Sequence, residues 1–208
     1  MDKDVAYKIE NFFEKFKSQT FKKGEILIRA DEDPSGIFYL KSGYVKQYSI
    51  SPKGEELIVN IYRTPAFFPM SWAINDTHNA YYFQATTGVE VSKASKGEVL
   101  KFIKKEQDVL YDLLSRIFNG LDGLLVRMTY LMAGNAYLRL VAELIIQTKR
   151  FGHELKVSEK DLAAETGMSR ETVSREMKIL KNKGLVVFNK SLLKIVNLEK
   201  LENELTLF

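Results

Sequence analysis

The chain has 208 residues, of which 45% are hydrophobic and 28% charged, a composition typical of a globular protein with one large or two small domains. The absence of cysteine excludes disulfides, iron–sulfur clusters and thiolate zinc sites, and only two histidines are present, so we expect no metal site. Residues 135–208 carry 13 basic side chains against 10 acidic ones and so most of the net charge of +4, which fits a nucleic-acid-facing region as well as a solvated basic surface.

The first hundred residues are predicted to form a short helix followed by a β-rich domain. Their start places apolar side chains at helical spacing and lacks the basic start and apolar stretch of a signal peptide. No apolar run in the chain is long enough to span a bilayer, so we expect a cytoplasmic protein without a membrane partner.

Short segments rich in β-branched and aromatic residues alternate with glycine-bearing turns in this region. Several short strands at such spacing are typical of a sandwich or barrel. Leu57, Val59 and Ile61 alternate with their neighbours as in a half-buried strand. We expect strands within residues 25–30, 37–43, 44–50, 55–63, 81–87 and 89–95.

Residues 98–134 are predicted to form one long helix because no proline interrupts them. Along it, apolar residues recur at alternating steps of four and three for three heptads, a seam that favours a parallel coiled coil between two copies of the chain. The alternative is a helix packed on its own β domain. Asn135 falls on the next seam position, where a polar residue can fix the register of a dimer. The seam residues are Leu110, Leu114, Ile117, Leu121, Leu124, Met128 and Leu131.

Further helices and a small hairpin are predicted for residues 135–208, joined to the long helix almost without interruption. Ser158 and Asp161 resemble a capping box that begins a short helix. Gly167 provides the backbone freedom for a tight turn, and Ser169 caps the helix that follows. The predicted domains are therefore residues 1–100, 101–134 and 135–208.

The second of these short helices has one apolar and one polar face. Val173, Met177 and Leu180 recur at steps of four and three, so we expect them to face inward and to leave the basic side chains outside. Gly184 ends the helix, and residues 185–196 are predicted to form a two-stranded wing.

The polar face of this helix fits the major groove of double-stranded DNA. A recognition helix places its N-terminal residues against base edges, where arginine can donate twice to guanine and glutamate can accept from cytosine. The alternative is a helical hairpin with a merely solvated charged face. The candidate base-contacting residues are Arg170, Glu171, Ser174 and Arg175, and the candidate phosphate-contacting residues are Ser158, Ser169, Thr172, Asn189 and Lys190.

Residues 169–175, SRETVSR, resemble the recognition helix of the cAMP receptor protein/FNR (Crp/Fnr) family of bacterial transcription regulators. Arg170, Glu171 and Arg175 match the arginine, glutamate and arginine of the cAMP receptor branch, and residues 171–175 also fit the E-x-x-S-R pattern of the FNR branch. Residues 21–59 are similar to the cyclic-nucleotide-binding-type β-roll of this family, and the seam helix is similar to its dimerisation helix.

The resemblance implies an α+β fold with an N-terminal, jelly-roll-like β-roll, a long dimerisation helix and a C-terminal winged helix-turn-helix. It also implies a homodimer that binds palindromic DNA sites with a TGA core and contacts RNA polymerase. The outer bases of the half-site, the target genes, the choice between activation and repression and the small-molecule effector stay open.

The phosphate cassette of the family's nucleotide-binding members is missing here. In those members a Gly-Glu pair, followed some ten residues later by an Arg-Ser or Arg-Thr pair, holds the cyclic phosphate. Residues 67–73 of this chain read FFPMSWA and residues 79–83 read NAYYF, and Leu124 and Leu125 replace the hydroxyl residues expected on the long helix. Because a buried phosphate would lack its counter-charge, we expect no cyclic nucleotide and predict no cofactor.

Two other sensing chemistries are open. His78 lies in the part of the roll where a haem sensor of this family carries a histidine, although a single histidine in a polar loop is more often solvated. A group of aromatic residues either lines an apolar pocket for a small organic effector or fills the core, which would leave a regulator that acts without a ligand. The candidate pocket residues are Tyr62, Phe68, Trp72, Tyr82, Leu124 and Met128.

Other classes of function have less support in the sequence. We find no nucleophile–base pair, carboxylate dyad, P-loop or metal cluster, so we expect no enzyme and name no catalytic residue. A ligand-binding module or haem sensor with altered DNA recognition is the alternative, but the trio Arg170, Glu171 and Arg175 argues for an intact DNA reader.

Overall fold

The computed structural model describes residues 3–189 and 191–205, except for the side chain of Ala133. The chain divides into two compact units, the first ending at Ile117 and the second beginning at Phe118. The segment expected to stand alone as a dimerisation helix, residues 101–134, is therefore shared between the two units.

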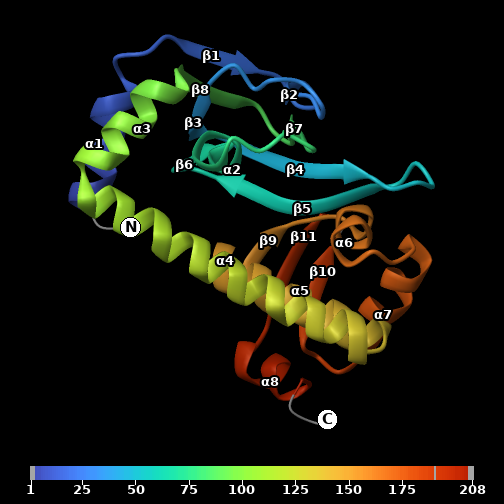
Figure 1. Cartoon of the computed structure of the whole chain (residues 1–208). Coiled ribbons are helices and arrows are strands. Elements are labelled where there is room, and N and C mark those ends of the chain that lie inside the picture. The colour runs from blue at the N-terminus through green and yellow to red at the C-terminus, as the bar shows by residue number, and fades with distance from the viewer. Residues whose placement is uncertain (1–2, 190, 206–208) are drawn as a thin grey trace. The chain divides into compact units, whose positions relative to one another are not determined.

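The described part of the first unit contains a roll of eight strands in two antiparallel sheets (Figure 1). One sheet has the order β1-β8-β3-β6 and the other the order β2-β7-β4-β5. The strands are β1 (Ser18–Phe21), β2 (Ile26–Ile28), β3 (Ile37–Ser42), β4 (Tyr44–Ile50), β5 (Glu56–Arg63), β6 (Ala66–Phe68), β7 (Tyr82–Ala85) and β8 (Val89–Ala94).

Six of these strands lie within the predicted segments, whereas β1 and β6 were not predicted. The sequence of β1, SQTF, is largely polar and exposed, so it shows no apolar alternation. Strand β6 has only three residues, all buried, and lies between Pro65 and Pro69. Neither strand carries the pattern from which strands are recognised.

The alternation predicted for β5 is interrupted. Gln47 pairs with Asn60 but Tyr48 pairs with Ile58, so Val59 is the extra residue of a β-bulge. Val59 is 42% exposed, while Tyr62, on the other face of the strand, packs against the core of the roll. The expectation that Leu57, Val59 and Ile61 share one buried face was therefore wrong.

Helices α1 (Lys3–Phe13) and α3 (Lys96–Lys105) cover a second apolar cluster of this unit. The ring of Phe12 stacks on that of Phe102 with the centroids 4.2 Å apart, and Phe13 stacks on Tyr39 of β3 at 4.8 Å. The short helix α2 (Met70–Asn75) adds Ala73 to the same cluster.

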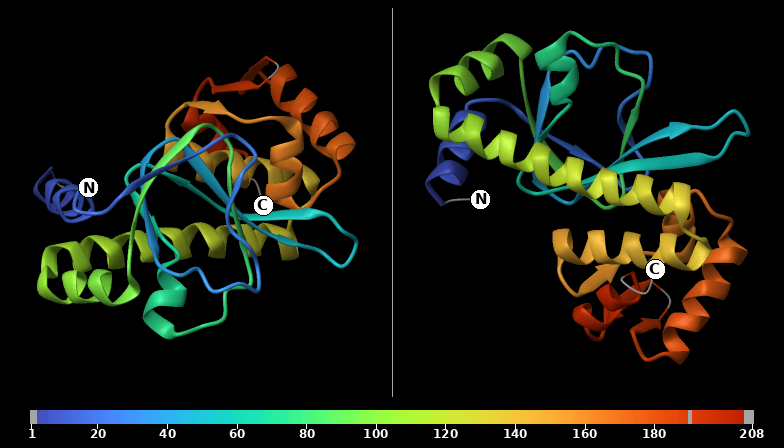
Figure 2. Two further views of the ribbon diagram at one scale, coloured as in Figure 1. Left: turned by 90° about the horizontal axis from the view of Figure 1, so that it is seen from above. Right: turned by 60° about the horizontal axis from the view of Figure 1, so that its bottom comes forward.

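The predicted helix over residues 98–134 is broken, which corrects our expectation. Glu106 has extended backbone angles and separates α3 from α4 (Gln107–Ala133), and both views of Figure 2 show two separate helices. The ammonium group of Lys8 lies 3.0 Å from a carboxylate oxygen of Glu106 and 2.7 Å from one of Asp108. A lysine from α1 thus bridges the break, a partner that no local pattern indicates.

All seven seam residues of α4 are exposed, from 38% at Leu110 to 56% at Leu131. An exposed apolar row of this length typically marks a surface that contacts another molecule. Leu110, Leu114 and Ile117 in particular are not packed into the roll of their own unit, which argues against the alternative of a helix buried on its own β domain.

The chain turns sharply between α4 and α5 (Ala136–Phe151) instead of continuing as one helix. Asn135 is the N-cap of α5, where its side-chain oxygen accepts the N–H of Leu138 at 3.0 Å, so the expected role in a dimer seam was wrong. Gly123 of α4 faces Ile146 of α5, and a Cβ added there would lie 3.5 Å from the Ile146 side chain. The two helices therefore pack closely.

The rest of the second unit is a winged helix-turn-helix, as predicted. It comprises β9 (Glu154–Lys156), α6 (Glu159–Thr166), α7 (Arg170–Asn182), β10 (Val186–Asn189), β11 (Leu192–Ile195) and α8 (Leu198–Asn203). The predicted wing is β10 and β11, and β9 joins it to form a sheet in the order β10-β11-β9, a strand that was not predicted. The α+β fold class is confirmed. Within the described residues, no helix is both long enough and apolar enough to cross a membrane.

Candidate nucleic-acid interface

The helix-turn-helix is built by local contacts that the sequence predicted. At the start of α6, the Ser158 hydroxyl accepts the Asp161 N–H at 3.2 Å and a carboxylate oxygen of Asp161 accepts the Ser158 N–H at 2.9 Å. Gly167 follows α6 with a φ of 64°, in the left-handed region that favours glycine. These contacts set the turn from which α7 begins.

Helix α7 presents one face to the core and the other to solvent. The Ser169 hydroxyl caps it by accepting the Thr172 N–H at 3.2 Å. Val173, Met177 and Leu180 are at most 1% exposed, as predicted. The opposite face exposes polar and charged side chains, namely Arg170, Glu171, Ser174, Arg175 and Lys178.

Arg170 and Glu171 lie free of the core at the N-terminal end of α7. The Arg170 side chain is 71% exposed and its Nε atom lies 3.7 Å from a carboxylate oxygen of Glu159. A hydrogen bond from the backbone N–H of Glu171 and one from the Ser169 hydroxyl hold the pKa of the Glu171 carboxyl below its ordinary value. Glu171 is thus kept as a charged acceptor.

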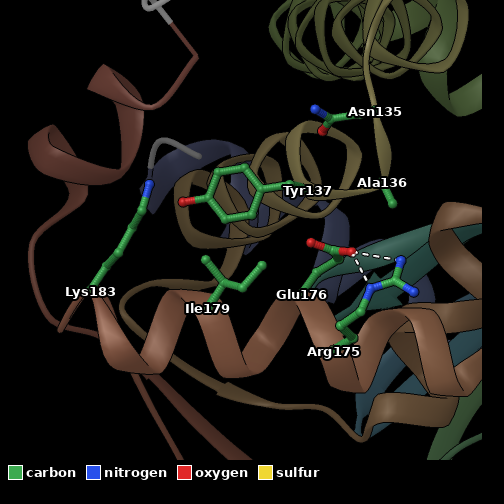
Figure 3. A pocket seen from close by; sticks show the side chains of 7 residues that line it. All are labelled: Asn135, Ala136, Tyr137, Arg175, Glu176, Ile179 and Lys183. Atoms are coloured by element: carbon green, nitrogen blue, oxygen red, sulfur yellow. Dashed lines mark hydrogen bonds and ion pairs between the residues drawn. The ribbon is translucent and has the colours of Figure 1, made fainter.

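Arg175 is exposed but engaged. Its Nε and Nη2 atoms lie 2.9 Å and 2.8 Å from one carboxylate oxygen of Glu176. The Arg175 side chain is 67% exposed and that of Glu176 only 9%. Both residues line an open depression of about 570 Å³ between α7 and the start of α5 (Figure 3). The sequence placed Arg175 outside correctly, but it did not indicate this pair.

The candidate phosphate-contacting residues lie at the starts of α6 and α7 and in the wing. The Ser158 hydroxyl lies 2.6 Å from the Asp161 carboxylate, and the hydroxyls of Ser169 and Thr172 lie 3.1 Å apart. Asn189 is exposed at the end of β10. Lys190 lies outside the described residues. The structure thus brings Ser169 and Thr172 together at one helix end and leaves their contact with DNA as a prediction.

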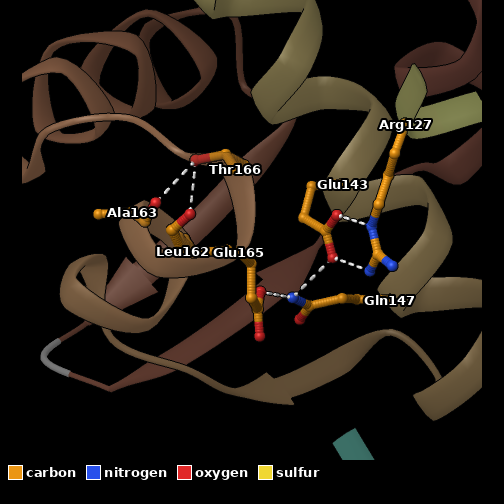
Figure 4. Close-up of polar contacts among 7 residues, drawn as sticks. All are labelled: Arg127, Glu143, Gln147, Leu162, Ala163, Glu165 and Thr166. Atoms are coloured by element: carbon orange, nitrogen blue, oxygen red, sulfur yellow. Dashed lines mark hydrogen bonds and ion pairs between the residues drawn. The ribbon is translucent and has the colours of Figure 1, made fainter. Parts of the chain in front are cut away.

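A buried polar network that the sequence analysis missed connects three helices of this unit (Figure 4). The guanidinium of Arg127 on α4 donates to both carboxylate oxygens of Glu143 on α5, at 2.6 Å and 2.7 Å. The amide nitrogen of Gln147 donates to Glu143 at 3.3 Å and also to Glu165 on α6. The available signal was the spacing of Glu143 and Gln147, one turn apart in an otherwise apolar run.

Glu165 carries the unusual ionisation of this network. Burial raises the pKa of its carboxyl well above the ordinary value, and the nearby Glu143 carboxylate raises this pKa further, whereas Arg127 opposes the shift. The Oε1 atom of Glu165 is buried and has no hydrogen-bond partner within the described part of the chain. Helix α6, the first helix of the helix-turn-helix, therefore carries a buried carboxyl group whose raised pKa favours the protonated form.

The candidate effector residues do not form one group. Phe68 is fully buried inside the roll, where its ring lies 4.8 Å from that of Tyr62 and 5.2 Å from that of Phe83. Tyr82 stacks instead on Tyr48 at 5.2 Å. Trp72 packs against the other apolar cluster of the unit. Leu124 and Met128 lie on α4 and are 49% and 48% exposed.

His78, the candidate haem ligand, lies at the surface. Its Nε2 atom is 2.8 Å from a carboxylate oxygen of Asp31, and the two side chains are 66% and 81% exposed. No group of three or more histidine, aspartate or glutamate side chains among the described residues could hold a metal ion. The geometry around His78 is that of a solvated polar pair.

Comparison with known families identifies both parts of the chain. Residues 18–106 match the cyclic nucleotide-binding domain, and residues 138–204 match the Crp-like helix-turn-helix domain. The two matches coincide with the roll and with the winged helix-turn-helix.

Three relatives of known function are regulators. The cAMP-activated global transcriptional regulator CRP of Haemophilus influenzae is 23% identical over 77% of this chain and 75% of its own length. The global nitrogen regulator of Nostoc is 25% identical, with coverages of 83% and 82%. The fumarate and nitrate reduction regulatory protein of Salmonella typhi is 23% identical, with coverages of 93% and 79%.

Solved structures share the fold. A mutant of CooA from Carboxydothermus hydrogenoformans superimposes with a TM-score of 0.77 at 20% identity, covering 93% of this chain and 89% of that one. The c-di-GMP responsive regulator CLP of Xanthomonas campestris gives a TM-score of 0.75 at 19% identity, with coverages of 92% and 99%. At these identities the likeness concerns the fold alone.

Proposed function

Because this chain belongs to the Crp/Fnr family of transcription regulators, we propose that it acts as a homodimer that binds palindromic DNA sites with a TGA core in each half. The observation that carries this proposal is the outward face of α7, which leaves Arg170, Glu171, Ser174 and Arg175 exposed beside a capped helix start. Such a face suits the major groove, since its arginines can donate to guanine and its glutamate can accept from cytosine.

Contacts to the DNA backbone would come from the helix starts and the wing. Ser169 and Thr172 lie at the N-terminus of α7, where free backbone N–H groups favour phosphate oxygens. Ser158 begins α6 in the same way. In the wing, Asn189 and Lys190 are the proposed contacts to phosphates beyond the groove.

Dimerisation would use the seam of α4. The seam residues are apolar and exposed from Leu110 to Leu131 of α4, a length of about 32 Å at a rise of 1.5 Å per residue. A second copy of the helix would remove this apolar surface from water and place two recognition helices for the two halves of a palindrome. RNA polymerase is the further partner expected of such a regulator.

The roll would not bind a cyclic nucleotide. In its interior Phe68 stacks on Phe83 and Tyr62 lies tilted against Phe68, and the residues between β6 and β7 include no arginine to neutralise a phosphate. A phosphate buried there would lack its counter-charge. The regulator either acts without a ligand or takes an apolar effector that displaces these rings.

Titration of the full chain with a fluorescent palindromic TGA duplex, against a scrambled duplex of equal length, tests this proposal. Arg175→Ala should weaken binding to the palindrome by about 5- to 150-fold, the value of one lost bidentate base contact, and change binding to the scrambled duplex much less. Lys200→Ala on α8, which removes the same charge from another exposed surface of the unit, is the control. Equal affinity of Arg175→Ala and the parent for the palindrome would refute specific readout by α7.

A further inference from the structure

Glu176 occupies a position of α7 that the helix otherwise gives to apolar side chains. The buried residues of this helix are Val173, Glu176, Met177 and Leu180, spaced as one face of a helix. Glu176 is only 7% exposed as a residue. A carboxylate in such a place is unfavourable unless it is paired, so its pairing needs a physical account.

Arg175 pairs with Glu176 by turning its side chain away from the helix face on which it lies. Consecutive residues of a helix point about 100° apart, so Arg175 and Glu176 do not face each other by default. Arg175 instead shares its helix face with Glu171, one turn earlier, on the side proposed to meet DNA. To place Nε and Nη2 within 2.9 Å and 2.8 Å of Glu176, the arginine bends toward the depression beside Ala136 at the start of α5 (Figure 3).

The contact takes two of the donors that a base would need. The hydrogen bond from Nε is charge-assisted, and such bonds are about twice as strong as neutral ones, while Nη2 adds an ion pair to the same oxygen. The Arg175 side chain is 67% exposed, however, so water and salt weaken the attraction and the contact can open. A guanine that offers two acceptors can displace it, whereas a single phosphate oxygen competes less well.

We propose that Glu176 is a positioning residue that holds Arg175 in a resting conformation, so that α7 releases the arginine only to a base with two acceptors. The inference rests on the proposed function, because it assumes that α7 reads DNA. It predicts that Glu176 lowers the affinity for the specific site, since part of the contact energy is used to break the pair. It also predicts that Glu176 lowers non-specific binding more strongly.

Duplex titrations with Glu176→Gln, which keeps the size of the side chain and removes its charge, test this role. Binding to the TGA palindrome should tighten by about threefold to tenfold, and binding to the scrambled duplex should tighten more, so that selectivity falls. Glu176→Met, an apolar residue of similar length, should give the same result. Glu199→Gln, an exposed carboxylate on α8, is the charge-matched control and should leave both affinities unchanged.

The double variant Arg175→Ala with Glu176→Gln distinguishes two effects of Glu176, namely its hold on Arg175 and its direct repulsion of the DNA phosphates. If Glu176 acts through Arg175, Glu176→Gln adds nothing in an Arg175→Ala background. A gain that persists in that background would overturn the inference, because it would reflect repulsion between Glu176 and phosphate. Weaker or unchanged binding of Glu176→Gln alone would also overturn it.

The pair can be observed without DNA. In the full chain labelled with ¹⁵N, the Arg175 Nε–H should be protected from exchange with water in the parent and lose this protection in Glu176→Gln. Protection in the parent combined with no affinity for any duplex would refute the proposed function but leave the pair intact. DNA binding by the parent together with an unprotected Arg175 would refute the inference alone.

Discussion

The interiors of the two units contain different kinds of side chain. Inside the roll, Phe68, Phe83 and Phe38 pack as aromatic rings with aliphatic neighbours. In the second unit, the aliphatic core lies beside a bidentate pair of Arg127 and Glu143, a buried amide and the carboxyl of Glu165. The first interior gains stability from apolar burial, which hardly depends on pH. The second depends in part on the charge state of buried groups, so its packing responds to the solution.

Of the changes suggested by this contrast, the loss of an aromatic ring from the roll should lower the free energy of unfolding the most. Phe68→Ala removes a fully buried ring that contacts the rings of Phe38, Tyr62 and Phe83, and should lower the free energy of unfolding by about 3–5 kcal/mol. Denaturant unfolding of the full chain measures this change. Tyr7→Ala, which removes a 65% exposed ring from α1, should change stability by less than about 0.5 kcal/mol. Equal effects would show that the rings of the roll are not its main support.

Breaking the charged pair of the second unit should have the next largest effect. Arg127→Ala leaves the carboxylate of Glu143, 2% exposed, without its counter-charge, and should cost about 3 kcal/mol. Replacing both partners by apolar residues, as in Arg127→Met with Glu143→Leu, should recover most of this loss because no buried charge remains. Denaturant unfolding of the single and double variants compares them directly. A double variant as unstable as Arg127→Ala would contradict a dominant electrostatic cause.

The smallest of these effects concerns the proton on Glu165. Its pKa is raised in the folded protein above the ordinary value of 4.5, so the folded state holds a proton that the unfolded state has released. Stability should therefore fall as pH rises from about 4.5 through the raised pKa and level off above it. Burial is the largest cause of this raised pKa, Glu143 and Asp161 raise it further, and Arg127 and the hydrogen bond from Gln147 lower it.

Glu165→Gln, which imitates the protonated acid, should remove this decline and stabilise the protein by roughly 1 kcal/mol at neutral pH. Thermal unfolding of variant and parent between pH 4 and pH 8 measures the difference. Phe68→Ala should shift the whole profile without changing its slope. A profile that is parallel for Glu165→Gln and the parent would place the pH dependence elsewhere.

Features fixed by neighbours along the chain were predicted well. The caps at Ser158 and Ser169, the turn at Gly167 and the inward stripe of α7 are all as expected, because each depends on side chains within a few residues of one another. Most strands of the roll were recognised for the same reason, since a run of β-branched and aromatic residues carries its own period.

Features set by distant partners were missed. The break at Glu106 is bridged by Lys8, and the bulge at Val59 appears only in the pairing of β4 with β5. In the sequence Asn135 falls on the seam pattern, whereas in the structure the chain turns back at this point and Asn135 caps α5. A periodic pattern cannot show where a helix stops if the reason for stopping lies elsewhere in the fold.

The sequence by itself determined the order of most elements, the outward basic face of α7 and the likeness to a family of regulators, because these depend on local periodicity, capping and motif. Only the tertiary structure decided what the buried polar side chains do: that Glu143, Gln147 and Glu165 form a network with Arg127, and that Glu176 holds Arg175. The physical reason is that a charge inside a protein is tolerated only beside a partner, and the path of the folded chain determines which partner it meets.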